Sequence, residues 1–297
     1  MSQVLDSGMV INDSMGSLDS VKSEVITVEQ DPTSKELAFI HYLVSNELYG
    51  DAQYSLNALE QDSSILEGQK DSIEYFQGWL SYYQRDFDNS LNHFNQIDKQ
   101  SELLVASQFF SVMCLLELGD NVGAEGLLNE ISSKDRPDIA ELKILYQSGF
   151  ALLKRDYAAY DSLVALYKTN NYLIAAERTG FDQYANDLRV YKDKSPLVAG
   201  LLSALVPGLG KYYAGYKGHP FGALAITLPF AAPAIELAIL AGLTSPLFIA
   251  SGALFGLFYF GNIWGSALSV KTHKSDYYGE IDYNIVIDLH VPLRRVF

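Results

Sequence analysis

Apolar and polar positions follow a helical period over residues 34–191 and then give way to an almost uninterrupted apolar stretch. In the first part apolar residues recur every three or four positions, the spacing of amphipathic helices. Residues 195–270 contain only three charged side chains, which are Lys211, Lys217 and Glu236. The pattern therefore predicts an all-α chain with a helical domain over 34–191 and a membrane-inserted region over 192–272.

Four stretches of the helical domain align with one another. Their marker aspartates recur at intervals of 34 to 36 residues, the length of a two-helix repeat. These aspartates are Asp51, Asp86, Asp120 and Asp156. In the second copy Gly78 leaves room for a neighbouring helix, and Ser90 and Phe94 occupy small and large packing positions after the turn. Such helix pairs bury their apolar faces by stacking into a curved superhelix.

This pattern resembles the tetratricopeptide repeat over residues 34–170, with Gly78–Trp79 through Phe94 as its best match. The first and fourth copies depart from it, with Leu43 and Ser148 at the position of the repeat glycine. A generic helical solenoid is the alternative. The resemblance implies that the concave face binds a peptide or a helix of a protein partner.

The apolar region divides into three predicted helices. Leu197–Val206 is ended by Pro207–Gly208 and is too short to cross a bilayer, so we expect an interfacial or re-entrant helix. Phe221–Ala241 and Pro246–Val270 are each long enough to cross. Together they predict a hairpin of two membrane-spanning helices.

The stretch "LVPGLGKYYAGYKGHPFG" forms a predicted hinge before this hairpin. Proline and glycine break the short helix and permit sharp turns, and tyrosines and lysines favour the boundary between water and lipid. The predicted hinge residues are Pro207, Gly208, Gly210, Tyr213 and Gly215.

Together with "GNIWG" near the end of the last helix, the hinge resembles the P-G-x-G-x-x-Y-x-G hairpin of small bacterial membrane proteins. That hairpin is related in style to the two-transmembrane-hairpin domain family. The resemblance covers about residues 195–266. It implies an integral protein of the bacterial inner membrane and no particular activity.

Small residues are spaced four apart on the last predicted helix. They form two small-xxx-small pairs, Gly252 with Gly256 and Gly261 with Gly265, which permit close contact between membrane helices. We expect packing within the hairpin or between copies in a homo-oligomer. The alternative is that glycine is simply common in membrane helices.

Glu236 is the one carboxylate inside a predicted spanning helix, just beyond Pro229 and Pro233. Those prolines can kink or break the helix, and a carboxylate within a membrane is a candidate for an ion or proton path. Asn262 on the other helix is its candidate hydrogen-bond partner. Alternatively Glu236 reaches the membrane interface from near the helix end.

Charge is unevenly distributed along the chain. Residues 1–191 hold 13 Lys and Arg against 30 Asp and Glu, a net charge of −17, and residues 192–297 hold 8 against 6, a net charge of +2. An acidic chain does not suit nucleic acid. Lysines bracket the hairpin and the turn between its helices is uncharged, so the positive-inside rule predicts a cytoplasmic repeat domain. A removed signal peptide would instead place that domain in the periplasm.

We predict different structures for the two ends of the chain. Residues 1–33 have no aromatic residue and no long apolar run, which predicts a disordered leader, with a segment that folds on binding as the alternative. In the tail, residues 273–297, apolar and polar residues alternate from Ile285 to Val291, which predicts a short strand that pairs with a partner's sheet edge.

Catalytic patterns are weak throughout the sequence. Gly208-x-Gly210 lacks the third glycine of a dinucleotide site, the five histidines form no ligand-spaced pair, and Cys114 lies in an apolar helical run. We therefore expect no enzyme and no cofactor. The favoured function is a membrane-anchored adaptor or assembly factor that binds a protein partner through its repeats, and the alternative is a small transport or channel component with Glu236 in the path.

Overall fold

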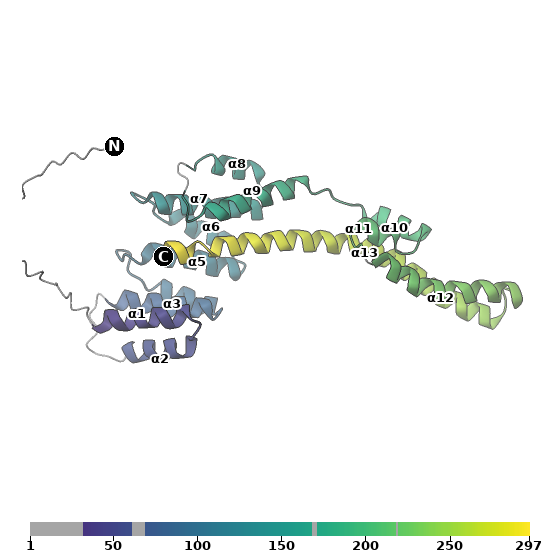
Figure 1. Ribbon diagram of the computed structural model, residues 1–297, viewed down its shortest axis with the longest axis horizontal. Coiled ribbons are helices and arrows are strands. Elements are labelled where there is room, and N and C mark those ends of the chain that lie inside the picture. Colours follow the sequence, from purple (N-terminus) through teal and green to yellow (C-terminus); the bar gives the residue numbers. More distant parts are fainter. Residues whose placement is uncertain (1–31, 61–68, 168–170, 218) are drawn as a thin grey trace, which may run out of the picture.

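The structure is a computed structural model that describes residues 32–60, 69–167, 171–217 and 219–297 (Figure 1). The predicted leader lies outside the described residues, apart from its last two positions, which belong to the first helix. All regular elements in the described ranges are helices and none is a strand, which confirms the all-α prediction. The helices are α1 (Pro32–Ser45), α2 (Tyr49–Glu60), α3 (Lys70–Tyr83), α4 (Phe87–Phe94), α5 (Leu104–Glu117), α6 (Asn121–Glu130), α7 (Pro137–Leu153), α8 (Tyr157–Val164), α9 (Ala175–Val190), α10 (Pro196–Leu205), α11 (Leu209–Ala214), α12 (His219–Leu240), α13 (Pro246–His290) and α14 (Leu293–Val296).

Helices α1 to α8 form successive antiparallel pairs that stack side by side, and α9 closes the stack (Figure 1). The second pair packs as its residues predict. A Cβ on Gly78 would lie 2.7 Å from the ring of Phe94, and the hydroxyl of Ser90 donates a 2.8 Å hydrogen bond to the carbonyl of Gly78. The absence of a side chain at Gly78 is therefore what lets α3 and α4 touch.

Three of the four marker aspartates start the second helix of their pair. Asp86, Asp120 and Asp156 are N-caps, and each carboxylate accepts a hydrogen bond from the backbone N–H three residues later. Asp51 instead lies in the first turn of α2. Leu48 is the equivalent of the three caps, because the residue before it, Glu47, has the positive φ found just before each capping aspartate.

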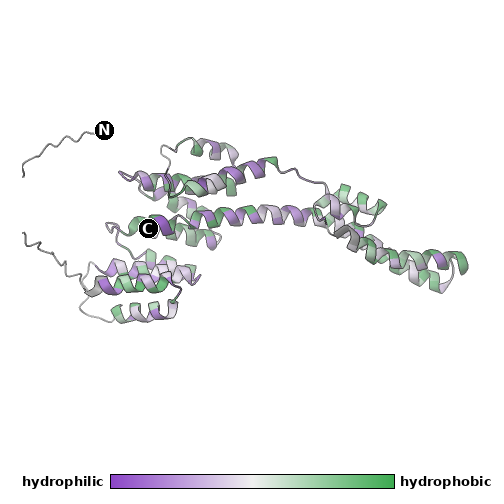
Figure 2. Ribbon diagram, in the orientation of Figure 1, coloured by the Kyte–Doolittle hydropathy of each residue, from purple (hydrophilic) through white to green (hydrophobic). Residues whose placement is uncertain are grey.

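The hairpin projects from the repeats as an apolar arm made of α10, α11, α12 and the first half of α13 (Figures 1 and 2). Two helices among the described residues, α12 and α13, are long and apolar enough to span a membrane. Helix α12 has 22 residues, about 33 Å at 1.5 Å per residue, and continues as one helix through Pro229 and Pro233.

The predicted strand at the C-terminus is wrong. Residues 285–290 belong to helix α13, which runs without interruption from the hairpin to His290, and Val291 is its C-cap. Ile281, Ile285 and Leu289 recur every fourth residue and share one buried helix face. That spacing outweighs the short alternating pattern, because these three side chains join the hydrophobic core of the repeats.

Candidate interaction site on the inner face of the repeats

Helix α13 connects the apolar arm to the inner face of the repeats. Its 45 residues make a rod of about 67 Å. The C-terminal segment, defined here as residues 277–297, lies between the two ends of the solenoid (Figure 1) and contacts α7 and α9, while α14 contacts α5. The inner surface of the repeat stack is thus partly filled by the chain's own end.

The apolar side chains of the C-terminal segment are completely buried. Ile285, Leu289 and Leu293 have no exposed surface. Leu289 lies against Gly149 of α7, where a Cβ would come within 3.0 Å of it. The repeats and the C-terminal segment therefore share one core, although the sequence divided them into separate domains.

Tyrosine hydroxyls donate hydrogen bonds to backbone carbonyls across the contact between α13 and the repeats. Tyr146, which is completely buried, donates a 2.8 Å hydrogen bond to the carbonyl of Leu289. Tyr277 on α13 donates in the other direction, at 3.1 Å, to the carbonyl of Asp187 in α9. Carbonyls in the last turn of a helix have no partner within the helix, so Tyr146 satisfies a group that would otherwise be buried without a bond.

Two ion pairs and a tyrosine–carboxylate hydrogen bond link the C-terminal segment to the repeats. Arg155 places two guanidinium nitrogens on the two carboxylate oxygens of Asp282, at 2.7 and 3.0 Å. Arg295 pairs with the buried Glu177 at 3.0 Å. Tyr184 donates to Asp288 at 3.0 Å, and burial raises the pKa of that carboxyl.

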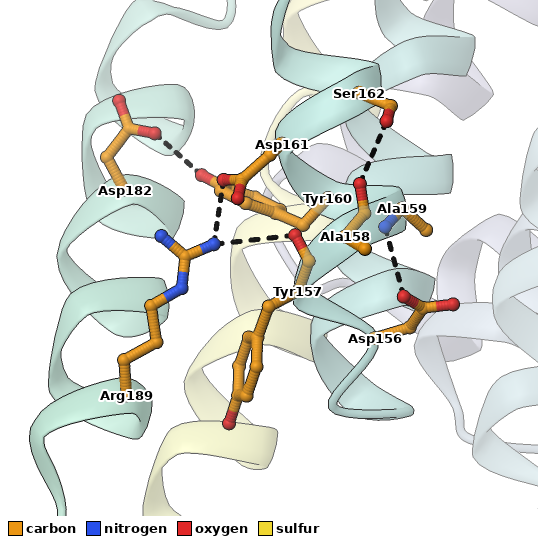
Figure 3. Close-up of polar contacts among 9 residues, drawn as sticks. All are labelled: Asp156, Tyr157, Ala158, Ala159, Tyr160, Asp161, Ser162, Asp182 and Arg189. Atoms are coloured by element: carbon orange, nitrogen blue, oxygen red, sulfur yellow. Dashed lines mark hydrogen bonds and ion pairs between the residues drawn. The ribbon is translucent and has the colours of Figure 1, made fainter.

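Helix α9, which supports α13, is itself fixed to α8 (Figure 3). The Tyr160 hydroxyl donates a 2.7 Å hydrogen bond to Asp182, and Arg189 donates one of 2.7 Å to Asp161. Asp156 is the N-cap of α8. These bonds fix α9 to α8, and α9 in turn contacts the C-terminal segment.

His290 ends α13 in a partly buried aromatic setting. Its Nδ1 lies 2.7 Å from the Tyr82 hydroxyl, and the two rings are stacked. Burial, with Arg294 as a second cause, lowers the pKa of His290 to about 4. The ring is therefore neutral near pH 7 and shares a hydrogen bond with the Tyr82 hydroxyl, whose direction depends on the tautomer of the ring.

The other side of the C-terminal segment is open. We call this space the inner groove. It consists of two clefts, of about 270 and 500 Å³, which share Tyr83 and Arg294. The walls come from α1, α3 and α5 on one side and from α13 and α14 on the other, with His41, Trp79, Tyr83, Arg85, Ile287 and Arg294 among them. The walls combine aromatic rings with two exposed arginines, a surface suited to a protein segment.

The hinge residues have distinct structural roles. Gly208 and Gly215 have φ of 90° and 126°, in the left-handed region that favours glycine. A Cβ on Gly210 would lie 1.9 Å from the carbonyl of Ala199, so only glycine lets α11 lie against α10. Pro207 lies at the break between α10 and α11, and the Tyr213 hydroxyl accepts a hydrogen bond from the Ser195 backbone N–H at 3.2 Å.

The small residues of α13 do not pack against α12. A Cβ on Gly256, Gly261 or Gly265 would meet nothing within 4 Å, and one on Gly252 would meet only Phe248 of the same helix. Helix α13 also packs against α10, where the Ser203 and Ser266 hydroxyls lie 2.7 Å apart and Ser203 accepts from the N–H of Gly210. Contact between copies through these glycines stays a prediction.

Glu236 and Asn262 are not brought together. Glu236 is exposed on α12, whereas Asn262 is 9% exposed and neither of its amide atoms has a hydrogen-bond partner among the described residues. The rings of Phe230 and Phe258 stack with centroids 4.4 Å apart and fix the register of the hairpin. In that register Glu236 lies about ten residues nearer the tip than Asn262, roughly 15 Å along the axis.

No cluster of His, Cys, Asp and Glu suited to a metal ion occurs in the part of the chain that the structure describes. Cys114 is buried, its thiol lies 3.3 Å from the Ser90 hydroxyl, and burial raises its pKa to about 12. It is therefore a packing residue without thiolate character at neutral pH.

The contact at the inner face was not predicted from the sequence. Tyr146, Arg155 and Asp282 form it, and the only available signal was the fourfold spacing of Ile281, Ile285 and Leu289, which the alternating pattern obscured. Searches against family models, curated proteins and solved structures found no match to this chain.

Proposed function

We propose that this chain is a membrane-anchored adaptor or assembly factor that binds a protein partner through its helical repeats and is not an enzyme. One observation supports this most strongly. Helix α13 is one continuous helix that begins in the apolar arm and ends in the core of the repeats. A continuous helix fixes the distance and the orientation of the repeats relative to the surroundings in which the arm is embedded.

In this proposal the arm lies in a lipid bilayer. Apart from Glu236, the exposed side chains of its two long helices are mostly apolar, among them Leu257, Phe260 and Trp264, which are 69%, 70% and 77% exposed. Contiguous apolar surface of this kind is unstable in water and requires a cover. Four lysines at the base of the arm form no ion pair with any described residue, whereas Lys274 pairs with Asp193. These four are Lys192, Lys211, Lys217 and Lys271. By the positive-inside rule this base, and the repeats beyond it, are cytoplasmic, in a bacterial inner membrane.

The partner would bind in the inner groove. The C-terminal segment occupies the α7 and α9 side of the inner face, so the open side beside α1 and α3 is the available surface. The transport alternative gains no support from the placement of Glu236, which bonds to no polar group of the described residues and lies away from Asn262.

The membrane part is tested by alkaline extraction of cell membranes. The wild-type chain is expected to stay in the pellet. A Leu257→Arg, Phe260→Arg variant is expected to move to the soluble or aggregated fraction, because each arginine costs about 2.5–3.5 kcal/mol at the centre of a bilayer. The matched control is Tyr54→Arg, Val122→Arg, which alters exposed residues of the repeats. Release of the wild-type chain by alkali would contradict the membrane anchor.

A further inference from the structure

The second and fourth repeats present an arginine at the same place. Arg85 and Arg155 each stand immediately before the capping aspartate of their repeat, with φ of 63° and 61°. Both therefore leave the turn in the same backbone conformation. Because the two arginines are equivalent, the ion pair that Arg155 makes indicates which kind of partner Arg85 lacks.

Arg155 forms an ion pair with a carboxylate of α13 on the inner face. Both of its terminal nitrogens bond to Asp282 of α13. Arg85 also lines the inner groove, yet it is exposed and makes no ion pair with any residue that the structure describes. The exposed Arg294 at the shared edge of the two clefts donates a 2.7 Å hydrogen bond to the Tyr83 hydroxyl and lies over the Tyr83 ring, but it forms no ion pair within the part of the chain that the structure describes. Two guanidinium groups in this aromatic groove thus lack a carboxylate.

The segment that directly precedes α1 is acidic. Residues 1–31, which lie outside the described residues, contain one lysine and six carboxylates. These carboxylates are Asp6, Asp13, Asp19, Glu24, Glu29 and Asp31. The same segment has Leu18, Val21, Val25 and Val28 at intervals of three and four, the spacing of one apolar helix face. Acidic groups with an apolar face match a groove of arginines and aromatic rings.

The chain length permits this contact. Residue 31 joins α1, whose residues His41, Val44 and Ser45 form part of the groove wall. The neighbouring α3, from Lys70 to Tyr83, is about 21 Å long, which a helix of 14 residues would cover. A segment of 31 residues can therefore reach the whole groove, and its covalent link gives it an effective concentration in the millimolar range.

We propose that the acidic segment 1–31 docks in the inner groove of its own chain, with its carboxylates on Arg85 and Arg294. Docked there, it covers the surface assigned to the protein partner and competes with that partner. The proposal goes beyond the adaptor function and does not depend on it, since the docking would occur with or without a partner.

The test is a photo-crosslink in the full chain. p-Benzoyl-phenylalanine replaces Ile287, which lines the groove and is 38% exposed. The control carries it in place of Tyr54, which is 78% exposed on α2. After irradiation, mass spectrometry of a digest of the monomer band is expected to show crosslinks to peptides from residues 1–31 for the groove position and not for the control. Crosslinks only to a second copy, only to another protein, or to no peptide of residues 1–31 would overturn the proposal.

Charge variants of the same crosslinkable chain test the role of the arginine. Arg85→Gln is expected to lower the crosslink yield about two- to fivefold, the range of an exposed ion pair, and added salt should lower it likewise. Arg136→Gln is the control, because Arg136 pairs with Asp138 away from the groove, and should leave the yield unchanged. Glu117→Gln removes an exposed carboxylate from the groove wall and should raise the yield. A yield that does not respond to Arg85→Gln would overturn the assignment of Arg85, whether or not the adaptor function holds.

Discussion

The hydroxyl of Tyr146 donates a hydrogen bond of 2.8 Å to the backbone carbonyl of Leu289, although 143 residues separate them in sequence. The bond joins the fourth repeat to the helix that leaves the apolar arm. Both groups are buried, so each would lack a partner without the other. This contact therefore links the two halves of the chain.

Tyr146→Phe tests the strength of that link. The ring keeps its packing against Phe109, and only the hydroxyl is lost, which leaves the Leu289 carbonyl buried without a bond. We expect the free energy of unfolding to fall by about 1–3 kcal/mol. Chemical denaturation in detergent measures the change, and Tyr42→Phe, at a residue that is 57% exposed, is the matched control. Equal stabilities of the two variants would contradict a structural role for this bond.

His290 makes the contact sensitive to pH. Burial lowers the pKa of His290 from 6.5 to about 4 in the folded chain, so the unfolded chain takes up this proton first as the pH falls. Stability is therefore full above pH 6.5, declines between pH 6.5 and about 4, and declines no further from this group below that. After discounting for partial exposure, we expect a loss of roughly 1–2 kcal/mol.

The measurement is the unfolding free energy of wild type and His290→Gln at pH 7.5 and pH 4.5. The variant should lose less stability than wild type on acidification. Asp288 nearby acts in the opposite sense, since its pKa is raised in the fold, but it is present in both proteins and cancels in the comparison. A larger acid-induced loss in the variant would show that the buried imidazole is not the responsible group.

Gly210 is expected to be irreplaceable in the hinge. A Cβ at this position would lie 1.9 Å from the Ala199 carbonyl and 2.6 Å from the Ser203 hydroxyl. Gly210→Ala should therefore separate α11 from α10, lower stability by about 1–3 kcal/mol or more, and speed tryptic cleavage at Lys211. Gly256→Ala is the control, because a Cβ there meets nothing within 4 Å and alanine favours a helix by about 1 kcal/mol. Similar cleavage rates in the two variants would contradict the close contact.

Asn262→Leu should not destabilise the arm. The Asn262 side chain is buried and both amide atoms lack a partner in the described structure, so a leucine of similar volume removes an unfavourable group. We expect an unchanged or higher melting temperature in detergent, with Ser266→Leu as the destabilising comparison, because Ser266 is completely buried and bonded to Ser203. A clear loss of stability in Asn262→Leu would show that a bound water or lipid group satisfies the amide.

Local features of this fold could be predicted well from the sequence. The capping aspartates Asp86, Asp120 and Asp156, the Gly78–Phe94 contact and the break at Pro207–Gly208 each depend on residues close together in the chain. Such features follow from backbone chemistry and the sterics of neighbouring helices.

The contact at the inner face could not be predicted in the same way. It joins Tyr146 to Leu289 and Arg155 to Asp282 across more than a hundred residues, and nothing local marks these side chains as partners. The alternating residues from Ile285 favoured a strand because the inward face of α13 has one apolar residue per turn and its outward face is partly apolar as well, as at Ile287. Tertiary packing decided the structure of this segment.

The most direct test of the proposed function is affinity capture from gently solubilised membranes, using the full chain. The contact at the inner face rules out the isolated repeats, residues 34–191, as a sound comparison, because they lack the C-terminal segment that completes their core. The comparison is instead between wild type, Ile287→Asp in the inner groove and Tyr54→Asp on the outer surface. We predict one partner protein in near-equal amount with wild type and Tyr54→Asp, and at least a tenfold loss with Ile287→Asp. Recovery of copies of this chain alone, or of a partner that Ile287→Asp retains in full, would contradict an adaptor that works through its inner groove.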